Sequence, residues 1–236
     1  MSDKPIILIG AEVRATLEGR KKQKRIVIKE PEDWDLLAYL GFERDVDGQH
    51  SFRFDHPTGC YDGSIKSPYE IGDKLWVRET WATTEQAGDH KADSYVVYRA
   101  TDPDWETMEG WKWRPSIHMP RWASQITLEV KDVRVERLKD ISEDDALAEG
   151  IERREFTRRD GSKMVGYSDD WSRLGQLSRF AGGIFPRNEK HPLKEEDICL
   201  GSARMGFANL WNSINEKRGF GWYTNPWVWV IEFEKI

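Results

Sequence analysis

The feature that most limits the fold is a long run of alternating side chains at residues 125–138, QITLEVKDVRVERL. Apolar and polar residues alternate with the period of a β-strand, so we expect a strand with one face in the core. The chain closes on a second strong strand pattern, NPWVWVIEFEKI, at residues 225–236. Shorter strand patterns are found at residues 5–9, 24–29, 72–81 and 94–100.

Three helical patterns lie between these strands. AEVRATLE at residues 11–18 predicts two helical turns, and GFANLWNSIN at 206–215 carries apolar side chains at helical spacing. ISEDDALAEG at 141–150 predicts a compact helix. Ser142 suits its N-cap, and Gly150 suits the position that ends it.

The order of these elements predicts an α+β fold. Several strands of this length that are not consecutive suggest a small mixed β-barrel with helices at its rim. The first and last strands are both apolar, and we expect that they could pair. We expect a single domain over residues 1–236, with inserted loop regions at about 30–70, 82–120 and 152–200.

Composition limits the partners and the compartment. The net charge of −6 gives the whole molecule no general attraction to phosphate, so nucleic-acid binding would need a local basic surface.

Cys60 and Cys199 lie far apart, which favours a reduced, cytoplasmic protein. The opening residues are not typical of a signal peptide, and no apolar run approaches the ~20 residues that span a bilayer, so no membrane partner is expected. His50, His56 and Cys60 lack a fourth ligand, so neither a metal nor another cofactor is expected.

The segment EGRKKQKR, at residues 18–25, is the most basic part of the chain. Five of the six residues from Arg20 to Arg25 are basic, and they lie on the predicted turn between a helix and a strand. Three interpretations are open: a solvated charge run, a nucleic-acid patch, or the rim of an active site. The helix, glycine and strand around the segment favour a rim, with the extra lysines facing solvent and phosphate.

Four blocks of the sequence occur in one order: LEGRK (17–21), GDKLWVR (72–78), residues 125–150 and WVIEFE (229–234). Together they resemble the ASCH domain, a family of PUA-like β-barrels. A longer pattern adds RETW (78–81), HMPRWAS (118–124) and NPWVWVIEF (225–233). This longer pattern is similar to ASCH proteins encoded by phages and prophages.

The resemblance implies two different functions. One is the binding of RNA or modified nucleotides. The other is an amidohydrolase activity that removes the acetyl group from N4-acetylcytidine, attributed in a bacterial relative to a Lys, a Thr and a Glu. Lys21 and Glu149 match the Lys and the Glu, and we expect them to converge at one mouth of the barrel. Lys24 stands where the Thr is expected, so we predict little hydrolysis.

The leading prediction is therefore binding of a nucleic acid or modified nucleotide by a phage or prophage accessory protein. RNA or a modified nucleotide is the preferred partner, and DNA remains open. The alternatives are the amidohydrolase, with Lys21 and Glu149 as catalytic candidates, and an interaction protein with a vestigial pocket. Trp111, Trp113 and Trp122 could stack on an unpaired base or pack against the barrel. The candidate nucleic-acid contacts are Arg20, Lys21, Lys22, Lys24, Arg25, Arg78 and Trp122.

Overall fold

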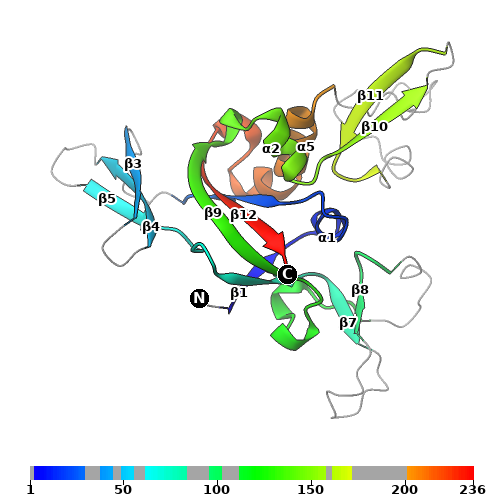
Figure 1. The fold of residues 1–236 in the computed structure, drawn as a ribbon, viewed down its shortest axis with the longest axis horizontal. Coiled ribbons are helices and arrows are strands. Elements are labelled where there is room, and N and C mark those ends of the chain that lie inside the picture. The colour runs from blue at the N-terminus through cyan, green and yellow to red at the C-terminus, as the bar shows by residue number, and fades with distance from the viewer. Residues whose placement is uncertain are drawn as a thin grey trace.

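The fold is mixed α+β and is built on one five-stranded sheet (Figure 1). It comes from a computed structural model that describes residues 3–29, 38–44, 49–55, 62–83, 96–102, 112–157, 161–171 and 201–236. The strand order is β1 (Asp3–Ile7), β6 (Lys74–Arg78), β9 (Thr127–Arg137), β12 (Trp227–Lys235) and β2 (Gln23–Val27). β1 is parallel to β6, and the other pairs are antiparallel.

The strand β12, which lies between β9 and β2, has apolar side chains on both faces because both faces of the sheet are covered. Trp229, Ile231 and Phe233 belong to one core cluster, which also holds Val13 of the helix α1 (Gly10–Leu17). Val228 belongs to the second cluster, on the opposite face. This explains why the closing segment is apolar almost throughout instead of alternating.

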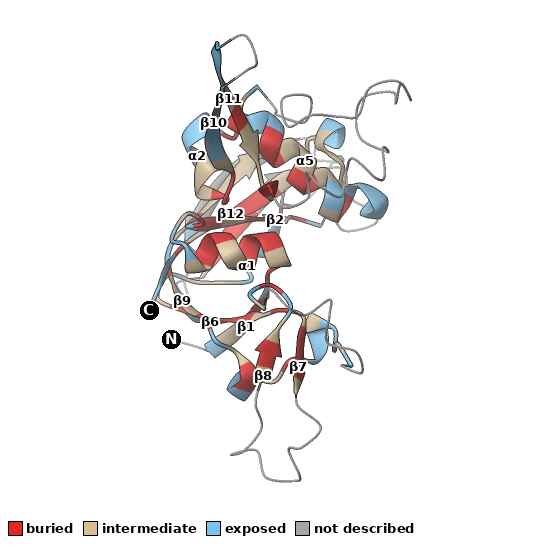
Figure 2. Ribbon diagram, turned by 90° about the vertical axis from the view of Figure 1, so that its right-hand side faces the viewer, coloured by how far each residue is buried: buried red, intermediate tan, exposed pale blue. Residues whose placement is uncertain are grey.

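Two helices cover the second face, where α2 (Glu143–Ala148) packs on α5 (Ala203–Asn215). Phe207, Leu210 and Trp211 of α5 are buried against this face, at the helical spacing that the sequence predicts (Figure 2). The N-cap of α2 is Ser142, whose hydroxyl accepts a hydrogen bond from the Asp145 amide at 3.0 Å, as predicted.

The predicted pairing of the first and last strands is wrong. β1 bonds to β6, whereas β12 bonds to β9 and β2. Within the described residues no ladder joins the edge strands β1 and β2, so the hydrogen-bonded sheet does not close. The prediction failed because apolar composition indicates that a strand is buried but does not indicate which strand lies beside it.

Smaller sheets occupy parts of the predicted insertions. Residues 38–66 hold a three-stranded antiparallel sheet, and two hairpins follow later in the chain. These strands are β3 (Ala38–Arg44), β4 (His50–Asp55), β5 (Asp62–Lys66), β7 (Trp81–Thr83), β8 (Val96–Tyr98), β10 (Glu152–Thr157) and β11 (Lys163–Ser168). Short 3-10 helices are η2 (Ser116–His118), η3 (Arg121–Ala123), η4 (Leu138–Asp140), η6 (Glu216–Arg218) and η7 (Trp222–Thr224). Among the described residues, no helix is both long enough and apolar enough to cross a membrane.

Candidate functional site: a charged pocket beside the basic turn

The basic turn is fixed by backbone hydrogen bonds at the end of α1. The amides of Arg20 and Lys21 both donate to the Ala15 carbonyl, at 2.9 and 3.0 Å. The amide of Lys22 donates to the Ala148 carbonyl at 2.7 Å, which joins the turn to the end of α2. Two segments more than a hundred residues apart in the sequence are thereby held side by side.

Gly150 allows this close approach. Its φ is +102°, and a Cβ atom there would lie 2.8 Å from the Cβ of Ala15 and 3.3 Å from that of Lys21. A side chain would therefore meet both an unfavourable backbone conformation and a steric clash. The glycine that the sequence assigns to the end of the helix also sets the distance between α2 and the turn.

Lys21 and Glu149 converge, as predicted. The Lys21 Nζ lies 2.8 Å from Glu149 Oε2, and it also donates to the Glu149 carbonyl at 2.9 Å. Glu12 Oε1 lies 3.2 Å from the same nitrogen, and all three side chains are buried. Burial alone would lower the pKa of Lys21, but the charges of Glu149 and Glu12 outweigh it and raise that pKa. Lys21 is therefore held as a cation and not as a free base.

Lys24 is committed to Glu12. Its Nζ lies 2.7 and 2.9 Å from the two carboxylate oxygens. Burial raises the pKa of Glu12, but Lys24 and Lys21 overcome this effect and lower it to about 2. An ammonium bound to a carboxylate cannot replace the attacking hydroxyl that the resemblance expects at this position.

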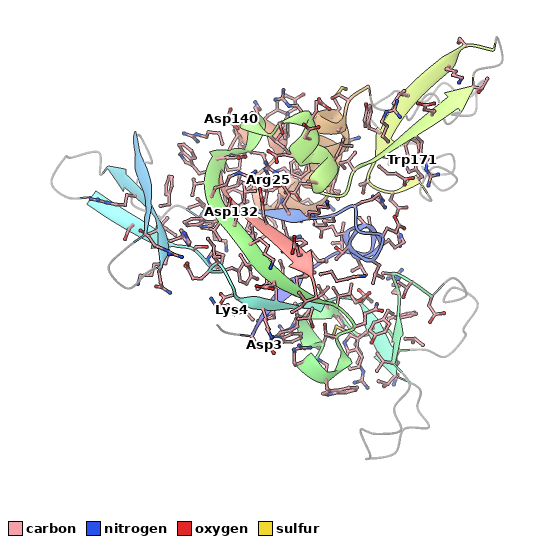
Figure 3. All side chains as sticks on the ribbon, viewed as in Figure 1. Asp3, Lys4, Arg25, Asp132, Asp140 and Trp171 are labelled. Atoms are coloured by element: carbon pink, nitrogen blue, oxygen red, sulfur yellow. The ribbon has the colours of Figure 1, made fainter. Side chains whose placement is uncertain are left out.

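Arg25 links this group to the sheet. Its guanidinium contacts Glu149 Oε1 at 3.1 Å, Glu136 Oε2 at 2.9 Å and Asp145 Oδ2 at 3.4 Å. Strand register explains the arrangement, because Val230 pairs with Arg25 on one side and Arg134 on the other. Figure 3 labels Arg25 beside β9 and below α2 in that view.

The buried Nε of Arg25 has no hydrogen-bond partner within the described part of the chain. The same guanidinium lies 5.8 Å from the ring centroid of Phe207. A buried N–H without an acceptor is unusual in a folded protein and costs free energy. The described residues therefore leave the hydrogen bonding of Arg25 incomplete.

A pocket of about 170 Å³ lies over this network. Its buried charged residues are Glu12, Arg25 and Glu149, with Lys24 only slightly exposed. Its apolar wall comes from α5, through Phe207, Leu210, Trp211 and Ile214. Two exposed cations, Lys29 and Arg218, also line it. The pocket therefore combines a polar interior, an aromatic wall and positive charge where it meets solvent.

The other cations of the basic turn lie outside this pocket. Arg20 pairs with Glu18 at 2.5 Å and donates to the Gly150 carbonyl. Lys22 is exposed, and with Arg20 it lines a separate, open hollow of about 420 Å³. The sequence therefore indicates where the basic charge lies, but most of it is neutralised by the protein's own carboxylates.

Arg78 and Trp122 are not brought to the pocket. Arg78 lies at the end of β6 with its guanidinium 4.5 Å from the centroid of Trp76. Trp122 is 46% exposed and packs edge-on against Trp81 at 6.0 Å. Trp111 lies outside the described residues.

The histidine and cysteine candidates form no metal cluster in the described part of the chain. His50 Nδ1 lies 2.6 Å from Glu70 Oε2. His56, Cys60 and Cys199 lie outside the described residues, and no group of three or more possible ligands is found among the rest.

Sequence reasoning missed several pocket residues. Phe207 and Trp211 were expected as core residues, and their helical spacing gives no sign that they also line a pocket. Glu12 had no distinguishing signal in its weak helical pattern. Lys29 and Arg218 lie at opposite ends of the chain, so only the fold brings them together.

Glu79 is a further buried group, at the end of β6. Its Oε1 accepts a hydrogen bond from Gln125 at 2.9 Å, whereas its buried Oε2 has no partner within the described residues. Burial raises the pKa of Glu79 to about 7. The indole nitrogen of Trp81, two residues later, is also buried without an acceptor in the same part of the structure.

Comparisons of the chain with protein-family models, with curated proteins and with solved structures found no match. The geometry of the pocket and the sequence resemblance are therefore the basis for a functional proposal.

Proposed function

We propose that this pocket binds a nucleotide, or an unpaired nucleobase of RNA. The observation that carries the proposal is the buried Arg25 Nε, which has no acceptor among the described residues and lies beside the aromatic wall of α5. A nucleobase offers carbonyl and ring-nitrogen acceptors on its edge and a flat face for stacking. Both features of the pocket would be used by a ligand of this kind.

The size of the pocket supports a small ligand. Its volume of about 170 Å³ is below the roughly 300–1,000 Å³ typical of pockets for drug-sized molecules. A single base fits this scale better than a stretch of polynucleotide. We therefore assign recognition to the pocket.

The ASCH resemblance supports the same proposal. It suggests a PUA-like barrel for the sheet and a phage or prophage accessory protein for the chain as a whole. RNA is preferred over DNA as the source of the base, because sequence-specific RNA binding commonly splays out unpaired bases.

Calorimetric titration with a panel of nucleosides and nucleotides, including N4-acetylcytidine, tests the proposal. We expect saturable binding that Lys24→Gln weakens, since Lys24 lines the pocket. Lys22→Gln is the matched control, because it removes one lysine from the same turn outside the pocket. Thermal unfolding of each variant checks the fold. Absence of binding across the panel at millimolar concentration would reject the proposal.

Hydrolysis of N4-acetylcytidine is the second candidate, favoured by the 2.8 Å contact between Lys21 and Glu149 beside the pocket. A raised Lys21 pKa and the Lys24–Glu12 pair both act against it. We expect little cytidine release by the wild type and some gain in Lys24→Thr. Efficient wild-type turnover that is lost in Glu149→Gln would make hydrolysis the primary function.

A further inference from the structure

We propose that Lys29 and Arg218 bind a phosphate group of the ligand, so that the pocket selects a phosphorylated nucleotide over the corresponding nucleoside. This inference rests on the proposed function, because it names the ligand class of the same pocket. It concerns the two exposed cations of the pocket and not the buried network beneath them.

The charge balance within the pocket is the first argument. Of the described residues that line it, two are carboxylates, and both are paired: Glu12 with Lys21 and Lys24, and Glu149 with Lys21 and Arg25. Neither Lys29 nor Arg218 forms an ion pair with any residue that the structure describes. Within the described residues, the Arg218 side chain donates its hydrogen bond to a neutral acceptor, Asn215 Oδ1, at 3.3 Å.

The origin of the two cations is the second argument. Lys29 follows β2 near the N-terminus, whereas Arg218 ends η6, directly after α5. Two cations from distant segments therefore line one pocket, in a chain whose net charge is −6. Elsewhere in this region, Lys21, Lys24 and Arg25 are all paired with carboxylates. Among the described residues that line the pocket, Lys29 and Arg218 are the cations that no carboxylate pairs.

The third argument is the order of aromatic and charged groups from the interior of the pocket to its exposed part. The buried Arg25 Nε and the α5 aromatic wall suit a base, and the exposed cations suit an anion outside it. A nucleotide has the same order, with an uncharged base joined through a sugar to a phosphate. Arginine can contact a phosphate through two N–H groups, and lysine adds a compact point charge.

The phosphate could belong to a free nucleoside monophosphate or to an RNA strand. The test therefore uses matched probes: each common ribonucleoside, its 5′-monophosphate, a dinucleotide with one internal phosphodiester, and inorganic phosphate. Calorimetry at low salt gives a dissociation constant for each. Tighter binding of the monophosphate than of the dinucleotide would identify the ligand as a free nucleotide or a 5′-phosphorylated end. Equal affinity for these two probes would identify an internal phosphate of RNA.

Two double variants distinguish phosphate binding by Lys29 and Arg218 from a general effect of positive charge. Lys29→Gln with Arg218→Gln removes both proposed contacts. Lys22→Gln with Lys217→Gln removes the same charge from exposed lysines that do not line the pocket. We expect the wild type to prefer the monophosphate about 10-fold, from two exposed ion pairs of up to ~1 kcal/mol each. The first variant should lose that preference, and the second should retain most of it.

The outcomes are distinguishable. Equal affinity of the wild type for nucleoside and monophosphate would overturn this inference and leave base binding intact. A preference that survives in Lys29→Gln with Arg218→Gln would also overturn it. Failure of every nucleoside and nucleotide to bind would reject the proposed function itself. Because both substituted side chains are exposed, a change in folding is not expected, and thermal unfolding of each variant checks this.

Discussion

Glu79 gives a pH dependence that can be worked out from the structure. Its side chain is 1% exposed, one oxygen bonds to Gln125, and burial raises its pKa from 4.5 to about 7. An acid with a raised folded-state pKa holds its proton more tightly in the folded protein than in the unfolded chain. Its contribution to stability is therefore greatest below pH 4.5 and is lost as the pH rises towards about 7.

The size of the effect follows from the two pKa values. Their difference, about 2.5, corresponds to roughly 3 kcal/mol at ~1.36 kcal/mol for each pH unit. Most of this change, about 2.5 kcal/mol, should fall between pH 5 and pH 8. Above pH 8 the contribution should be nearly constant, since Glu79 is then ionised in both states.

Urea unfolding of the wild type and Glu79→Gln across this pH range measures the effect. The difference between the two unfolding free energies isolates Glu79 from other titrating groups, because glutamine keeps the shape and the bond to Gln125 without an ionisable proton. Glu216→Gln, at an exposed position, is the matched control for the loss of one carboxylate. A wild-type-minus-Glu79→Gln difference that stays flat, or that rises with pH, would refute the assignment of a buried, neutral carboxyl.

Three further predictions concern the turn and the pocket. Gly150→Ala should destabilise the protein by about 1–3 kcal/mol, and by more than Gly19→Ala does. Both glycines have a positive φ, but only at Gly150 would an added Cβ atom meet another residue within 4 Å. Urea unfolding of both variants measures the difference. Lys21→Met should cost about 3–5 kcal/mol, since it removes the shared partner of two buried carboxylates, and a loss below ~1 kcal/mol would contradict that reading. Ser142→Ala should cost about 1 kcal/mol through the lost N-cap, measured by thermal unfolding.

Local patterns predicted two of the main strands of the sheet and the helix α2. The alternation at 125–138 and the apolar C-terminal segment gave β9 and β12, and Ser142 and Gly150 gave the limits of α2. These signals depend on residues close together in the sequence. The Lys21–Glu149 contact was also expected, but it came from the family resemblance and not from local pattern.

The charged network could not be predicted in the same way, because it depends on strand register. Arg25 and Arg134 lie in one row across the sheet, on either side of Val230. Arg134 and Glu136 of β9 are only partly exposed, and Arg134 contacts Asp145 of α2 at 3.2 Å. The alternation of polar and apolar residues distinguishes the two faces of a strand. It does not reveal that a helix covers the polar face.

The neutralisation of the basic turn changes how charge would act in recognition. Lys21, Lys24 and Arg25 are held by carboxylates at 2.7–3.1 Å, so they offer little net charge to a distant polyanion. Keeping such pairs buried is costly in desolvation, and a buried ion pair is weak evidence for stability. We infer that the network instead fixes the directions of the polar groups around the pocket. If the proposed function holds, the buried charges would select the shape and hydrogen bonds of the ligand, and attraction for its phosphate would come from the two exposed cations, Lys29 and Arg218.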